Sequence, residues 1–292
     1  MVTTVAQLIN KTKQIVYGAS RIELNRLTSD PGSGGTTVTF DFELKGIVQG
    51  NVISIDDELM YVWSTTAGTK TATVQRGFLG STPAAHAAGS LVEVNARFPQ
   101  FWIRQALQEE INNLTPPLYR VAGYDLAVTS TSRSYVMPVS NYLHVIDIRG
   151  YFTGYTSRPH ILGWSDTREA NLTDFPGGAA IFFPYDFSPN TALRLRVALP
   201  FDTSTFTDST DVEATVGMAA SMVDIPPLGA AVRLMQGREI PRTNMAAQPE
   251  PRHHDEVPPG HISSVVQQLK AAKDLRVQEE EFRLYEKYPV KR

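Results

Sequence analysis

Apolar and polar residues alternate in short runs over the first third of the chain, and turn-forming residues close each run. The clearest run, Thr37 to Leu44, places Val38, Phe40, Phe42 and Leu44 opposite polar neighbours and predicts a half-buried strand. Four more short strands are predicted at residues 51–55, 60–64, 71–75 and 91–94. Strands this short and closely spaced predict a small antiparallel barrel or sandwich over residues 36–97.

Helical spacing of apolar residues marks the other parts of the chain. Val5, Leu8 and Ile9 predict a short N-terminal helix, which a loop follows up to residue 35. Phe101 to Leu114 predict a central helix within residues 98–118, which must end before Pro116-Pro117. Residues 262–288 predict a long amphipathic helix.

A second β-rich region spans residues 119–225. Its candidate strands lie at residues 134–139, 144–152, 161–164, 179–183, 192–199 and 213–218, with prolines at their margins, which is typical of a sandwich with loops. Residues 226–292 then form a helix (228–236), a Pro- and Arg-rich linker (239–259) and the long C-terminal helix. The predicted class is α+β, mainly β: a small antiparallel barrel or sandwich, a central helix, a second β-sandwich and a C-terminal helical arm.

Composition narrows the function classes. The chain has 292 residues, 42% of them hydrophobic, which predicts two or three sub-domains. A formal net charge of −3 argues against a protein that coats DNA. The lack of cysteine excludes disulfides, thiolate catalysis and Cys-based metal sites. No secretory signal and no stretch of membrane-spanning length are evident, so we expect a soluble protein made in the cytoplasm.

The most distinctive segment runs from Arg76 to Gly89. It lacks the spacing of either glycine-rich phosphate loop and leads into a strand, which argues against nucleotide binding. We expect Gly77, Gly80 and Gly89 to supply backbone conformations that other residues avoid. Arg76 and His86 are expected to make hydrogen bonds that fix a loop at the rim of the barrel.

Other candidate chemistry has simpler explanations. Asp56, Asp57 and Glu58 lack calcium-loop spacing and predict a hairpin turn with solvated carboxylates. The six histidines lack a helical metal-binding pattern, and no nucleophile motif is present. We therefore predict no catalytic, cofactor-binding or metal-binding residue and no cofactor. A set of aromatic residues could form a platform on which sugar rings stack, although aromatic side chains at strand and helix positions are more often part of a core. The set is Trp63, Trp102, Trp164, Tyr151, Phe152 and Tyr155.

Three parts of the chain are similar to tailed-bacteriophage virion proteins. The first is Glu58-Leu59-Met60-Tyr61-Val62 with residues 73–82 and His86-Ala87-Ala88-Gly89. The second is Arg97-Phe98-Pro99 running into the central helix with Asn112-Asn113. The third is Pro226-Pro227-Leu228-Gly229 through Met235, Arg238-Glu239 and the ending 279–289. Together they cover about half of the chain and resemble head-to-tail connector (adaptor or neck) proteins.

This resemblance implies a homo-oligomeric ring in the virion at the head-tail junction, dodecameric on a portal protein, that extends the DNA channel and carries tail or neck proteins. DNA would pass during ejection without sequence-specific binding. The implied ring contacts are Trp102, Ile103, Leu107 and Ile111. The implied portal-docking residues are Val266, Leu269, Leu275, Phe282 and Tyr285. The alternative is a tail, collar or baseplate β-protein that binds host-surface glycans.

Overall fold

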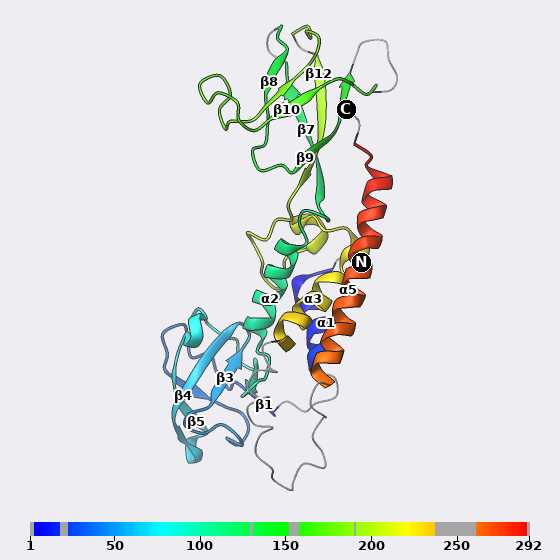
Figure 1. Ribbon diagram of the computed structural model, residues 1–292. Coiled ribbons are helices and arrows are strands. Elements are labelled where there is room, and N and C mark those ends of the chain that lie inside the picture. Colours follow the sequence, from blue (N-terminus) through cyan, green and yellow to red (C-terminus); the bar gives the residue numbers. More distant parts are fainter. Residues whose placement is uncertain are drawn as a thin grey trace. The chain divides into compact units, whose positions relative to one another are not determined.

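The computed structural model describes residues 3–17, 23–128, 131–151, 158–189, 191–236 and 261–290 (Figure 1). The chain forms two compact units. Unit 1 comprises Met1–Val5, Ile111–Ile225 and Ala272–Arg292, and unit 2 comprises Ala6–Glu110 and Pro226–Ala271. The predicted linker at 239–259 lies outside the described residues.

Unit 2 contains a curled antiparallel sheet of six strands in the order β1-β6-β3-β4-β5-β2. The strands are β1 (Glu23–Arg26), β2 (Thr37–Thr39), β3 (Val52–Ile55), β4 (Glu58–Thr66), β5 (Thr71–Gln75) and β6 (Leu91–Val94). Alternate side chains point inward because successive residues of a strand face opposite sides. They form one core that includes Phe40, Ile53, Met60 and Val92. The strands predicted at 51–55, 60–64, 71–75 and 91–94 are confirmed.

The strand predicted from Thr37 to Leu44 is shorter than expected, because β2 ends at Thr39. Beyond it, the buried side-chain amide of Asn25 binds the backbone in place of a strand partner. Its Oδ1 accepts from the Phe42 N–H at 3.2 Å, and its Nδ2 donates to the Glu43 carbonyl at 3.1 Å. Phe42 is 59% exposed, so its apolar side chain does not join the core.

Three helices contribute nearly all of their residues to unit 2: α1 (Val5–Tyr17), α2 (Gln100–Asn113) and α3 (Ile225–Gln236). On α1, Lys13 pairs with Glu93 of β6 at 2.7 Å. Helix α2 begins directly after Pro99, as predicted. Within the unit, the Glu110 carboxylate accepts from Arg233 Nε of α3 at 2.8 Å.

Unit 1 contains two antiparallel sheets of three strands with the orders β7-β12-β9 and β10-β11-β8. The strands are β7 (Arg120–Ala127), β8 (Ser134–Val136), β9 (His144–Tyr151), β10 (Ser165–Thr167), β11 (Ala180–Phe182) and β12 (Ala192–Leu199). Side chains from both sheets form one core, which includes Tyr142, Ile148, Ile181 and Leu195. Strand β7 was not predicted, since Gly123 and Asp125 interrupt its apolar pattern.

Two predicted strands of this region are wrong. Residues 161–164 are not a strand: Ile161 and Trp164 fill the core, and β10 begins one residue later. Val212–Val216, predicted as a strand with its neighbours, forms a π-helical turn. The cause is local, because the Asp211 carboxylate accepts from the N–H groups of Glu213 and Ala214 and caps this turn.

The long C-terminal helix is α5 (His261–Lys287). Its last turns belong to unit 1, where buried Glu280 accepts from the Ser221 hydroxyl at 2.7 Å. Within the residues described, strands outnumber α-helices by twelve to four, and the predicted α+β, mainly β class is confirmed. None of the helices in these ranges is both long and apolar enough to cross a membrane.

Candidate functional site

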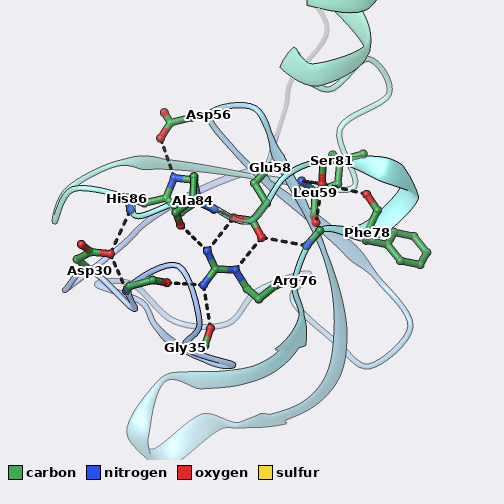
Figure 2. Close-up of polar contacts among 12 residues, drawn as sticks. Asp30, Gly35, Asp56, Glu58, Leu59, Arg76, Phe78, Ser81, Ala84 and His86 are labelled. Carbon is green, nitrogen blue, oxygen red and sulfur yellow. Dashed lines mark hydrogen bonds and ion pairs between the residues drawn. The ribbon is translucent and has the colours of Figure 1, made fainter.

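A buried ion network lies at the rim of the unit 2 sheet (Figure 2), and Arg76 stands at its centre. The Arg76 guanidinium forms a bidentate pair with Glu58, with Nε–Oε1 and Nη2–Oε2 distances both 2.7 Å. Its Nη1 donates to the carbonyls of Gly32 at 2.6 Å and Gly35 at 2.8 Å. Arg76 directly follows β5, which ends at Gln75. It thereby ties two loops to the sheet, one containing Gly32 and Gly35 and the other containing Ala84.

Glu58, the first residue of β4, is buried and accepts from every side of its carboxylate. Besides Arg76 it receives the backbone N–H groups of Gly77 and Ala84, each at 3.0 Å. Burial raises the pKa of this carboxyl, but hydrogen bonds from Arg76, His86 and the two N–H groups outweigh burial and lower the pKa to about 2. Glu58 is therefore ionised across the physiological pH range.

His86 lies between two carboxylates, as Figure 2 shows, with only 2% of its surface exposed. Its Nδ1 is 2.9 Å from Asp56 Oδ2, and its Nε2 is 3.0 Å from Glu58 Oε2. A ring whose two nitrogens both face carboxylate oxygens donates from both, which requires the imidazolium form. The hydrogen bond to Asp56, followed by that to Glu58, raises the pKa of His86 despite burial.

The network holds a tight turn that follows Arg76. Gly77, Leu79 and Gly80 have φ values of 61°, 52° and 84°, and Leu79 has a side chain that this region disfavours. The Ser81 hydroxyl accepts from the Leu59 N–H at 2.9 Å and fixes the end of the turn to β4. As a result Leu79 is held in solvent, 57% exposed, while Phe78 packs beside Tyr61.

The arrangement is suited to fixing a loop. Glu58 bonds both Arg76 and His86, and Asp30 accepts the His86 backbone N–H at 3.1 Å. Gly89, also at positive φ (83°), donates its N–H to the Leu27 carbonyl at 2.7 Å. Across the described ranges, no group of three or more His, Cys, Asp or Glu residues could hold a metal ion.

The sequence interpretation of the acidic cluster was wrong for Glu58. Asp56 and Asp57 do form the hairpin turn between β3 and β4, with side chains 56% and 42% exposed. Glu58, expected to be solvated, has a side chain with no exposed surface. The available signal was its position directly before the apolar residues Leu59 and Met60, together with Arg76 and His86 in the distinctive segment that follows.

The residues proposed for ring contacts on α2 lie mainly inside the protomer. Ile103, Leu107 and Ile111 have no exposed surface, so they stabilise this chain's own core and are not accessible to a neighbour. Trp102 is half-buried. Any contact of α2 with another chain would use its exposed residues, such as Gln105 and Glu109.

The five residues proposed for docking on α5 divide into two groups. Val266 is 8% exposed and Leu269 is half-buried. Leu275, Phe282 and Tyr285 are 58%, 62% and 68% exposed, although all three are large and apolar or aromatic. These three side chains therefore lie outside the cores of the two units.

The glycan-stacking platform is not formed as expected. Trp164 is 3% exposed and belongs to the unit 1 core, so it cannot stack on a ligand. Trp63 on β4 is half exposed, at 51%, and packs edge-on against Tyr61. The side chain of Tyr151 and the residues Phe152 and Tyr155 lie outside the part of the chain that the structure describes.

Comparison with known proteins adds no assignment. Neither the protein-family models nor the curated protein sequences give a match to this chain.

Proposed function

We propose that this chain is a structural subunit of a tailed-phage head-to-tail connector, which assembles as a ring, docks on the portal, extends the DNA channel and carries the tail. The sequence segments that resemble connector proteins support the proposal. The structural observation that carries it is the exposed row Leu275, Phe282 and Tyr285 on α5, whose other face is anchored by buried Glu280 and Leu284. A helix fixed on one side and apolar on the other is suited to binding another chain.

The ion network fits the same role. Arg76, Glu58 and His86 form hydrogen bonds within the network, and Arg76 also bonds backbone groups of the loops that the network fixes. Such a network makes the rim of the sheet rigid, which a subunit of a closed ring requires because each interface must repeat with the same angle.

Negative-stain electron microscopy of the purified chain, alone and mixed with a portal ring, tests the proposal. Class averages should show a closed ring coaxial with the portal. Particles that do not bind the portal would overturn the connector assignment and favour a tail, collar or baseplate protein.

A point variant tests the contribution of α5. Deleting the helix is unsuitable, since Glu280 and Leu284 are part of the unit 1 fold. We expect Leu275→Asp to weaken portal binding about tenfold or more, because it places a charge within an apolar contact. Leu172→Asp, at a residue 70% exposed on a loop of unit 1, is the matched control and should bind normally. Equal binding by both variants would remove Leu275 from the docking surface.

A further inference from the structure

The outward face of the β7-β12-β9 sheet in unit 1 carries three arginines close together. Arg194 and Arg196 are alternate residues of β12, so both point away from the core, to which Leu195 between them belongs. Arg149 of β9 lies directly opposite Arg194 in the strand register. Like charges in directly opposed positions repel each other and destabilise a sheet. The sequence therefore places positive charge on this face despite that repulsion.

The three guanidinium groups converge on one region of the face. Arg149 Nε donates to Asp147 Oδ2 at 3.1 Å, and Arg196 Nη1 lies 3.9 Å from the same oxygen, so one carboxylate orients both arginines. The Arg194 guanidinium lies over Gly123 of β7, since a methyl group added to Gly123 would be 3.0 Å from Arg194 Nε. Gly123 pairs directly with Arg196, so the Arg194 guanidinium lies beside Arg196.

Negative charge on these strands is limited, because β7, β9 and β12 contain only two acidic residues. Asp147 is buried, and His160 Nδ1 lies 3.6 Å from its Oδ2 as a further neighbour. Asp125 is 82% exposed and lies 4.0 Å from Arg194 Nη1. Arg158, two residues before His160, is exposed and brings another positive charge to this region. Positive charge therefore exceeds negative charge on this face.

Arg194 and Arg196 have hydrogen-bond donors that the described part of the chain does not use. Neither guanidinium donates a hydrogen bond to a described residue, since their contacts with aspartate, at 4.0 and 3.9 Å, are too long. By contrast, Arg76 and Arg276 each donate to several acceptors. The side chains of Arg194 and Arg196 are 49% and 40% exposed, so an external acceptor can reach them.

An oxyanion with several acceptor oxygens matches this arrangement, because the planar arginine fork pairs bidentately with phosphate. None of the exposed large apolar side chains in the described ranges lies on β7, β9 or β12. Interfaces between proteins have an apolar core, whereas interfaces with DNA are more polar and more positively charged. The observations therefore favour the phosphate backbone of a nucleic acid over an acidic protein.

We propose that Arg149, Arg194 and Arg196 form a contact site for the phosphate backbone of DNA. Backbone contacts carry no base information, so this binding is independent of sequence. Three arginines on a chain of net charge −3 give weak, salt-dependent binding, with a dissociation constant of about 10⁻⁴ to 10⁻⁶ M. The inference does not rest on the connector assignment, because a single copy of the chain carries the whole site.

Fluorescence anisotropy of a labelled DNA duplex of mixed sequence, titrated with the full chain at several salt concentrations, tests the proposal. We expect log K to fall with log salt concentration with a slope of about −3, one unit for each phosphate contact. Arg194→Gln should weaken binding about threefold or more and reduce the slope by about one. The matched control is Arg133→Gln, at an exposed arginine before β8 in the other sheet of unit 1. It changes the net charge by the same amount and should bind like the wild type.

Gly123→Ala separates the position of the charge from its amount. The added methyl group displaces the Arg194 guanidinium and leaves the net charge unchanged, so we expect binding about twofold weaker at an unchanged unfolding midpoint. Wild-type affinity of this variant would overturn the assignment of Arg194 to the contact.

Two competitors distinguish other sources of the same anionic chemistry. Polyglutamate should bind more weakly than DNA, and inorganic phosphate at the concentration of the DNA phosphates should not compete, because a single anion cannot contact all three arginines. Equal or tighter binding of either competitor would assign the face to an acidic protein or to free phosphate and overturn the proposal. A chain that does not bind the duplex at low salt, or equal weakening by Arg194→Gln and Arg133→Gln, would also overturn it. Portal binding through Leu275 is tested separately and is unaffected by these results.

Discussion

Glu58 is the residue on which the loop network depends, because it is the common partner of Arg76 and His86. Its carboxylate balances two cationic groups that are themselves almost entirely buried. A buried charge is tolerated only while its partners are in place, since desolvation costs more than any single contact returns. The contribution of this residue to stability is therefore larger than that of an exposed carboxylate in an otherwise similar ion pair.

We expect Glu58→Gln to lower the free energy of unfolding of unit 2 by about 3–5 kcal/mol, since it leaves Arg76 and His86 without a buried counter-charge. Urea unfolding followed by tryptophan fluorescence measures the change. The control is Asp57→Asn at the neighbouring position of the hairpin turn. It removes a pair with Arg104 in which the Asp57 side chain is 42% exposed, and should cost about 1 kcal/mol. Equal effects of both variants would contradict a central role for Glu58.

Stability of unit 2 should depend on pH in two windows. The pKa of His86 in the fold is raised above 6.5, so its contribution is complete below pH 6.5 and is lost as pH rises through the folded value. The pKa of Glu58 is lowered from 4.5 to about 2, so its contribution is complete above pH 4.5 and is lost as pH falls toward 2.

Unfolding midpoints of wild type and His86→Gln across pH 3 to 9 test this behaviour. The difference between the two proteins should be largest near pH 5 to 6 and should shrink as the solution becomes alkaline. A difference that grows with rising pH would show that the histidine is neutral in the fold.

At the scale of elements, helix α3 packs closely against Glu110 of α2 at a glycine, Gly229. A methyl group at Gly229 of α3 would come within 2.2 Å of the Glu110 carboxyl carbon. That carboxylate is buried and held by Arg233, so it has no free direction in which to move. The close approach of these two helix segments within unit 2 therefore requires the absence of a side chain at this position.

Gly229→Ala should lower the free energy of unfolding by about 1–3 kcal/mol through this overlap, although alanine favours helices more than glycine does. Gly68→Ala, where the added methyl meets open space, is the control and should change stability by about 0.5 kcal/mol or less. Thermal unfolding of the two variants measures the difference, and a stabilised Gly229→Ala protein would contradict the packing described.

The elements also show what the sequence could predict. Strands β3 to β6 and helix α2 follow from apolar periodicity, because one face of each is buried. Helix α5 lies where it was predicted, but Leu275, Phe282 and Tyr285 of its expected apolar stripe are exposed. The turn at Val212–Val216 depends on a side-chain cap from Asp211, which periodicity does not register. Likewise Arg76 and His86 were predicted to fix a loop, but burial of Glu58 could not be inferred, since a glutamate beside two aspartates in a hairpin is usually solvated.

At the scale of the whole molecule, unit 1 is assembled from three separate stretches of chain. Near its start, the Val5 N–H donates to the Thr210 carbonyl at 3.1 Å, and the Val212 N–H donates to the Thr3 carbonyl at 2.9 Å. From the last stretch, Arg276 donates to Asp224 at 2.8 Å and to the Ser221 carbonyl at 2.8 Å. Residues 211–224 thus depend on chain segments far apart in sequence.

Ending the chain after Ala271 should therefore loosen residues 211–224 while leaving the unit 2 sheet intact. Hydrogen exchange is the appropriate measurement, because it reports local opening of each segment. Amides of residues 220–224, where α5 bonds Ser221 and Asp224, should exchange faster, and those of β3 and β4 should keep their protection. Unchanged exchange at 211–224 would mean that α5 does not support this part of the fold.

The ion network has a consequence for how the unit 2 sheet folds. Its charges come from the start of β4, the end of β5 and the loop before β6, so they meet only when these strands are paired in the native register. A shift by one residue would reverse the faces of the strand and leave a buried charge without its partner. Misaligned hairpins are therefore discouraged by electrostatics as well as by the loss of apolar contacts, and the network acts as a check on strand alignment during folding.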